Sequence, residues 1–192
     1  MFASLLQLDR EIFSQINGFH DPVLDTVMYW ASNRFIWIPL YAWVLYLVIK
    51  HHRSELKIIL PSVSIMILIT DQFSVFVKNN VLRLRPCHDP YFSNTIHLVN
   101  ETCGGMYGFV SSHATNTMSL VLFLCLLLPK ESRWVKIELI AWTLLVSYSR
   151  VYLGAHFPGD ILGGWLIGIM AALISFQLYS LVKKRIASKT QC

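Results

Sequence analysis

Long apolar stretches dominate this sequence and restrict its possible folds more than any other feature. Five of them are long enough, or nearly so, to cross an apolar slab about 30 Å thick. They run roughly over residues 35–50, 57–77, 112–128, 135–152 and 160–182. Charged residues make up only 14% of the chain, against about 25% in a typical soluble domain, and the mean hydropathy is +0.52. The sequence therefore predicts an integral membrane protein, an all-α polytopic bundle of five to six transmembrane helices.

The N-terminal segment has a different pattern. Apolar residues recur at helical spacing over 1–20, while Asp9, Arg10 and Glu11 occupy the remaining face. Three adjacent charges make a transmembrane position costly, so we expect a helix that lies in the membrane interface. Residues 22–34 either extend the first span or form a separate short helix, and the pattern leaves both open. We expect the whole chain, 1–192, to form one membrane-embedded domain.

The basic residues indicate an orientation. Most of the sixteen Lys and Arg residues fall in three segments, 50–57, 129–136 and 183–189, which share one side of the membrane if the chain crosses it five times. The positive-inside rule makes that side cytoplasmic. We therefore expect 183–192 to be a cytoplasmic tail and 78–111 to be an extracytoplasmic loop. The same asymmetry accounts for the net charge of +5 without a nucleic-acid partner.

The remaining basic residues lie on the outer side, several of them beside other reactive side chains. They are Arg10, Arg34, Lys78, Arg83, Arg85 and Arg150. Taken singly, cations at span ends usually reach headgroups, and serines at a helix start usually cap it. Their coincidence at one face argues instead for a shared site, formed by Lys78, Arg85, Ser111, Ser112, His113, Arg150, His156 and Asp160. This set suits a phosphate group, which carries a charge of about −2 and needs fixed donors around it.

The arrangement of these residues resembles the three-part signature of the type 2 phosphatidic acid phosphatase family. The parts correspond to segments 78–86, 110–113 and 149–160. The first and third match the family at every position and spacing. The middle part, usually Pro-Ser-Gly-His, is Val-Ser-Ser-His in this chain, so the serine and histidine are kept while proline and glycine are replaced.

The resemblance implies a metal-independent dephosphorylation of a lipid phosphate or diphosphate, without a cofactor. His156 would attack phosphorus and form a phosphohistidine, with Asp160 orienting its imidazole. His113 would protonate the leaving group and then activate water. The implied phosphate-binding residues are Lys78, Arg85, Ser111, Ser112 (through its amide) and Arg150.

The implied substrate is a phospholipid or polyprenyl phosphate, with undecaprenyl diphosphate, phosphatidylglycerol phosphate, phosphatidic acid and lipid A as candidates. The protein would be a multi-pass protein of the bacterial cytoplasmic (inner) membrane, with its site on the extracytoplasmic side.

Two other functions stay open: a lipid phosphotransferase with the same histidines, and a non-enzymatic channel or transporter. A channel predicts several deep ionisable residues and internal repeats, whereas this chain has one deep carboxylate, Asp71, and no evident repeat.

Two further expectations concern single side chains. Asp71 lies two helical turns before Lys78, so we expect it to pair with a cation of the site, unless it only reaches headgroup water. Cys87 and Cys103 both fall in the outward loop, where an oxidising exterior favours a disulfide between them. The alternative is two free thiols.

Overall fold

The computed structural model describes residues 2–101 and 103–189. Throughout this part of the chain the regular structure is helical, and the β-type pairing within it is a single isolated bridge between Leu84 and Tyr107. The prediction of an all-α fold is confirmed.

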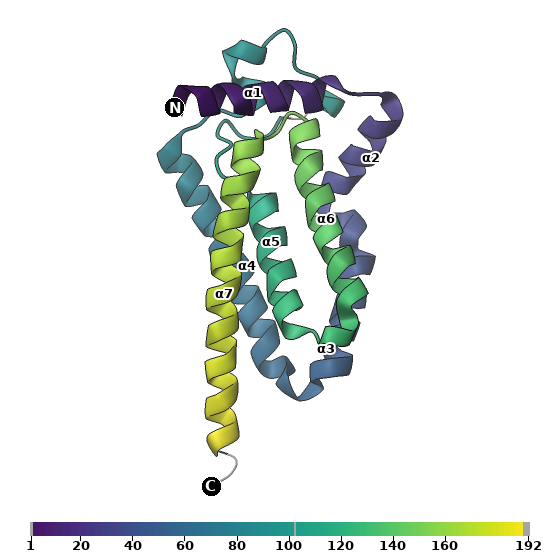
Figure 1. The fold of residues 1–192 in the computed structure, drawn as a ribbon, viewed down its shortest axis with the longest axis vertical. Coiled ribbons are helices and arrows are strands. Elements are labelled where there is room, and N and C mark those ends of the chain that lie inside the picture. The colour runs from purple at the N-terminus through teal and green to yellow at the C-terminus, as the bar shows by residue number, and fades with distance from the viewer. Residues whose placement is uncertain (1, 102, 190–192) are drawn as a thin grey trace.

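The first two helices lie at one end of the molecule (Figure 1). Helix α1 (Phe2–Gly18) lies across that end, and α2 (Pro22–Ser32) turns down along the side. The Asp21 carboxylate accepts hydrogen bonds from the first turn of α2, and Asn33 ends the helix in extended conformation before a 3-10 turn over Arg34–Trp37. Residues 22–32 thus form a helix distinct from α3 (Ile38–His52), and the 3-10 turn connects it directly to the start of α3 at Ile38.

The other α-helices form a bundle below α1 (Figure 1). These are α3 (Ile38–His52), α4 (Leu56–Val81), α5 (Ser112–Leu127), α6 (Arg133–Tyr152) and α7 (Pro158–Lys189). Helices α4 and α6 run toward α1, and α5 and α7 run away from it. The last turns of α4 and α6 and the first turns of α5 and α7 therefore meet at the end that α1 covers.

Two helix boundaries differ from the predicted segments. Helix α4 continues through Val81, so Lys78 belongs to its last turn and the connection to α5 begins at Leu82. Helix α7 continues to Lys189, so the expected tail is helical over 183–189; residues 190–192 lie outside the described part. Both helices extend beyond their apolar stretches. Polar and basic residues also have good helix propensity, and adding them to an existing helix needs no new nucleation.

The outer faces of the bundle are apolar. Leu68 and Phe76 of α4 are 63% and 61% exposed, and Leu166 of α7 is 63% exposed. Arg34–Val81, which comprises α3 and α4, and Pro158–Lys189 are apolar and long enough to cross a membrane, and α5 is a shorter apolar helix. Apolar surface of this extent suits lipid rather than water.

Helices α5 and α7 pack with their backbones in close contact. A Cβ atom on Gly164 would lie 2.8 Å from the Ser111 carbonyl oxygen, and one on Gly168 would lie 2.6 Å from that of Thr115. Small residues four positions apart allow this approach in membrane helices. The contact holds the start of α5 beside the start of α7, where the Ser111 N–H donates to the Asp160 carbonyl oxygen at 3.1 Å.

Candidate active site

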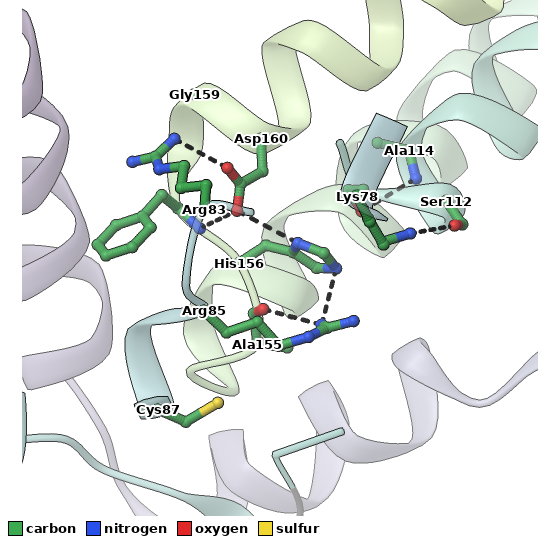
Figure 2. Close-up of polar contacts among 12 residues, drawn as sticks. Lys78, Arg83, Arg85, Cys87, Ser112, Ala114, Ala155, His156, Gly159 and Asp160 are labelled. Carbon is green, nitrogen blue, oxygen red and sulfur yellow. Dashed lines mark hydrogen bonds and ion pairs between the residues drawn. The ribbon is translucent and has the colours of Figure 1, made fainter. Parts of the chain in front are cut away.

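His156 lies at the centre of a buried polar cluster between α6 and α7. Its side chain is 2% exposed, and that of Asp160, in the first turn of α7, is 0% exposed. The His156 Nδ1 atom lies 3.3 Å from Asp160 Oδ2, and the Nε2 atom lies 3.1 Å from Arg85 Nη1 (Figure 2). A proton on Nδ1 satisfies both contacts, since Nδ1–H then donates to the carboxylate and Nε2 accepts from the guanidinium.

Burial and charge keep this imidazole neutral. Loss of water around His156 lowers its pKa well below the usual 6.5, and the positive charges of Arg85, Arg150 and Lys78 lower that pKa further. The neutral ring carries an unprotonated electron pair on Nε2, which accepts the hydrogen bond from Arg85. This is the form in which a histidine acts as a nucleophile.

Arg85 is fixed by the backbone around it. Its Nη1 atom also donates to the Ala155 carbonyl oxygen at 3.0 Å (Figure 2). A Cβ on Gly108 would lie 2.8 Å from Asp160 Oδ2 and 3.3 Å from Arg85 Cγ, so the bare glycine lets the connection between α4 and α5 lie against both side chains. The buried Nε of Arg85 finds no hydrogen-bond partner among the described residues.

The other predicted phosphate ligands border the same cluster. The Lys78 ammonium donates to the Ser112 hydroxyl at 2.5 Å (Figure 2). The Ser111 hydroxyl caps α5 by accepting from the Ala114 N–H at 3.4 Å. Arg150, near the end of α6, donates to the hydroxyl of Ser32 in α2. The first turn of α5 thus lies next to cations, and backbone N–H groups at a helix start beside positive charge suit an anion.

His113 belongs to this cluster as well. Its ring interacts electrostatically with Arg150, His156, Lys78 and Arg85. The structure therefore brings every residue of the predicted set to one end of the bundle, although they come from α4, α5, α6, α7 and the connection after α4. Two histidines, three cations and a helix start at the same end of the bundle can hold a phosphoryl group and transfer protons to and from it.

Sequence reasoning gave no role to Arg83, which contacts the site directly. Its Nη1 atom donates to Asp160 Oδ1 at 2.8 Å, and its Nη2 atom donates to Asp9 Oδ2 at 2.5 Å. One signal could have found it: Arg83 and Arg85 flank Leu84 in extended backbone, where alternate side chains point to the same face.

Asp71 has a different partner from the expected one. Its Oδ1 atom accepts a hydrogen bond from Asn116 Nδ2 at 3.4 Å, and Asn116 Oδ1 accepts one from Thr70 at 2.8 Å. No ion pair within 4.0 Å involves Asp71 in the described residues, so the expected direct pair with a cation is absent there. The carboxylate interacts with Lys78 at longer range.

The connection after α4 contains a disulfide between Cys87 and Cys103, with Cα atoms 5.9 Å apart. It lies two residues from Arg85 and next to Gly104, at which a Cβ would lie 3.6 Å from the Arg85 guanidinium carbon. Cys87, His88 and Cys103 are also the one described group of three possible metal ligands within 4.8 Å of one another. The disulfide occupies both sulfurs, so this group is better explained as a structural link.

Comparison with known proteins gives a consistent result. The family model described as PAP2 superfamily matches residues 59–184. A protein of Bacteroides thetaiotaomicron named lipid A 4'-phosphatase is 32% identical over 193 residues, which cover 99% of this chain and 85% of the relative. A protein of Sulfolobus acidocaldarius named undecaprenyl-diphosphatase is 32% identical over 173 residues, covering 88% of this chain and 78% of the relative.

A solved structure has the same fold. The transmembrane PAP2-type phosphatidylglycerolphosphate phosphatase of Bacillus subtilis superposes with a TM-score of 0.71 at 20% identity, covering 93% of this chain and 88% of that one. At this identity the likeness concerns the arrangement of helices alone.

Proposed function

The chain belongs to the PAP2 superfamily and is a membrane lipid phosphatase, and from that premise we propose that it hydrolyses a lipid-linked phosphate through a phosphohistidine on His156. The observation that carries the proposal is the pair of contacts on its ring, Nδ1 with Asp160 and Nε2 with Arg85. They aim a neutral nucleophilic nitrogen at a cation that can hold a phosphoryl oxygen. The resemblance found in the sequence is confirmed at the level of family and enzyme class, and the channel alternative loses its support.

The proposed reaction has two steps. In the first, His156 Nε2 attacks phosphorus, the bond from phosphorus to the lipid oxygen breaks, and protonated His113 gives its proton to that oxygen. In the second, His113 takes a proton from water, the water oxygen attacks phosphorus, and the phosphorus–nitrogen bond breaks to release inorganic phosphate. Asp160 stabilises the positive charge that forms on the His156 ring in between.

The charge that develops on the phosphoryl oxygens needs fixed donors. We assign these to Lys78, Arg85 and Arg150, with the Ser111 hydroxyl and the Ser112 amide at the start of α5. Arg85 and Arg150 can each offer a planar pair of N–H groups to two oxygens, and each has a buried Nε without a partner among the described residues. Guanidinium groups left partly unsatisfied in this way have donors to spare for an anion.

For the substrate, we propose a phosphomonoester on a lipid A-type glycolipid. Support comes from the relative named lipid A 4'-phosphatase, whose match covers 99% of this chain and 85% of the relative. The relative named undecaprenyl-diphosphatase supports undecaprenyl diphosphate as the second candidate. Both present a terminal phosphoryl group on a lipid, which is the part that the cationic cluster recognises.

We further propose that the chain is one domain with five spans, formed by α2–α3 together, α4, α5, α6 and α7, while α1 lies in the outer interface. The turns after α3 and α5 and the last turns of α7 lie at the end opposite α1 (Figure 1). They carry the basic segments 50–57, 129–136 and 183–189. By the positive-inside rule that end is cytoplasmic, so the site faces the extracytoplasmic side of a bacterial inner membrane.

The test compares the purified protein with its His156→Ala variant on lipid A, undecaprenyl diphosphate, phosphatidylglycerol phosphate and phosphatidic acid in detergent micelles. We expect phosphate release by the wild type, fastest with lipid A, and none above background by the variant. Equal release by both would overturn the phosphohistidine. Adding an unlabelled acceptor lipid to radiolabelled substrate separates hydrolysis from transfer, because a phosphotransferase would label the acceptor instead of releasing phosphate.

A further inference from the structure

We propose that Arg83 and, through it, Asp9 of α1 are positioning residues for phosphoryl transfer, so that the surface helix is part of the catalytic apparatus. This rests on the proposed function of His156 and extends it to two residues that the family signature does not specify: Asp9, and Arg83 between Lys78 and Arg85. A continuous chain of contacts runs from Asp9 to Arg83, from Arg83 to Asp160, and from Asp160 to His156.

The two oxygens of the Asp160 carboxylate have separate partners. Oδ2 faces His156 Nδ1 at 3.3 Å and accepts the Phe157 N–H at 3.0 Å. Oδ1 accepts from Arg83 at 2.8 Å (Figure 2). A carboxylate with no exposed surface is costly to ionise without a counter-ion, and Arg83 supplies that counter-ion from the side away from the imidazole. Arg83 thereby fixes both the charge and the rotation of the group that orients the nucleophile.

Arg83 is itself held in place. Its guanidinium carbon lies 4.4 Å above the centre of the Phe157 ring, and its second terminal nitrogen donates to Asp9 Oδ2 at 2.5 Å. The other Asp9 oxygen accepts the Gly159 N–H, in the first turn of α7, at 2.7 Å. A Cβ on Gly159 would lie 2.9 Å from Asp9 Oδ2, so the approach of the carboxylate requires a glycine there. Asp9 thus joins Arg83 to the helix that carries Asp160.

The rest of α1 is built to keep Asp9 at this position. Phe13, one turn later on the same face, is 1% exposed and contacts the rings of Phe92 and Phe157, with centroids 4.9 Å and 5.4 Å away. One further turn on, Asn17 donates to the carbonyl oxygen of Tyr152 at 2.7 Å. The inner face of α1 is therefore anchored to the last residue of α6 and to the segment after it, which contains His156.

The experiment measures kcat and KM of four variants in detergent micelles, with the lipid phosphate that the wild type hydrolyses fastest. Asp9→Asn and Arg83→Gln break the chain of ion pairs, and Arg83→Lys keeps the positive charge but lacks the planar pair of N–H groups that contacts the two carboxylates. Glu11→Gln is the matched control, an exposed carboxylate on the same helix. We expect kcat to fall about tenfold or more in Asp9→Asn and Arg83→Gln, by analogy with the loss of outer-shell partners that orient histidines in metal sites, while KM changes less than about threefold.

Two further results separate positioning from a merely structural role. Arg83→Lys should recover part of the kcat lost in Arg83→Gln, and the double variant Asp9→Asn/Arg83→Gln should be no slower than Arg83→Gln alone, because Asp9 acts through Arg83. The proposal would be overturned if the losses of kcat in the two single variants multiplied in the double variant. It would also be overturned if kcat fell only in proportion to the folded fraction measured in thermal melts. If Asp9→Asn and Arg83→Gln are as active as the wild type while His156→Ala is inactive, this inference is wrong and the proposed function stands. If His156→Ala still releases phosphate, the proposed function itself is wrong.

Discussion

The Lys78 ammonium donates a 2.5 Å hydrogen bond to the hydroxyl of Ser112, joining the last turn of α4 to the first turn of α5 across 34 positions of sequence. This contact gives the Ser112 side chain a partner of its own. The role assigned to Ser112 in phosphate binding uses its backbone N–H, which a substitution of the side chain leaves in place.

The first prediction compares removal of the Lys78 ammonium with removal of the Ser112 hydroxyl. Lys78→Met removes a charge from the phosphoryl site and should lower kcat/KM by about 10²-fold to 10³-fold, as loss of a transition-state donor usually does. Ser112→Ala keeps the amide and the start of α5, and should change kcat/KM by less than about fivefold. Steady-state kinetics on the best lipid phosphate measures both. Comparable losses in the two variants would make the hydroxyl itself a phosphate ligand.

The second prediction concerns stability against pH. The pKa of His156 is lowered from 6.5 in the folded protein, by burial first and then by the neighbouring cations. Below about pH 6.5 the unfolded chain therefore binds a proton at His156 that the folded chain does not, and the free energy of unfolding falls by up to about 1.4 kcal/mol per pH unit. Between about pH 7.5 and about pH 5.5, the wild type should lose more melting temperature than His156→Gln.

His51→Gln is the control for that experiment, since His51 is exposed at the opposite end of the bundle. It should lose as much melting temperature on acidification as the wild type. If His156→Gln also behaves like the wild type, the imidazole does not stay neutral in the folded protein.

Sequence patterns predicted the helices, and they predicted that the candidate site residues would lie at the same end of the bundle. Apolar periodicity identifies a helix, and the residues of the site lie at span ends that any alternating bundle brings to the same side. Helix ends were less predictable. Val81 and Lys189 end their helices beyond the apolar stretches, and polar residues such as those after Lys78 can continue a helix or leave it with little local preference.

The partners of charged residues could not be predicted, because they depend on how the helices rotate against each other. From the sequence, we expected Asp9 to be one of three charges on the polar face of α1. In the structure it contacts Arg83 and Gly159, which are far away in the sequence. Asp71 was expected to meet a cation, but α4 turns it toward Asn116 of α5. For Asp71 the sequence indicates that a charge within a span needs a partner without indicating which one, and for Asp9 it does not indicate burial at all.

The third prediction concerns the disulfide. The disulfide joins Cys87 and Cys103, which are 16 positions apart. Because it lowers the entropy of the unfolded chain, it should raise the free energy of unfolding by about 3 kcal/mol. The double variant Cys87→Ser/Cys103→Ser should melt at a lower temperature and show lower kcat, because Gly104 then no longer holds its place beside Arg85. Non-reducing mass mapping of the 84–110 peptide checks the link directly. Two alkylated thiols in protein isolated without reductant would contradict it.

The fourth prediction concerns the contact between α5 and α7. A Cβ on Gly168 would lie 2.6 Å from the Thr115 carbonyl oxygen, 3.0 Å from Met118 Cβ and 3.1 Å from the Ser119 backbone nitrogen, and none of these can move without shifting α5. Gly168→Val should therefore push the helices apart, lower the melting temperature, and reduce kcat, because the first turn of α5 carries His113 and the first turn of α7 carries Asp160. Gly105→Ala, where an added Cβ meets nothing within 4 Å, is the matched control and should leave both quantities unchanged. A Gly168→Val protein with wild-type melting temperature and kcat would mean that α5 and α7 do not pack this closely.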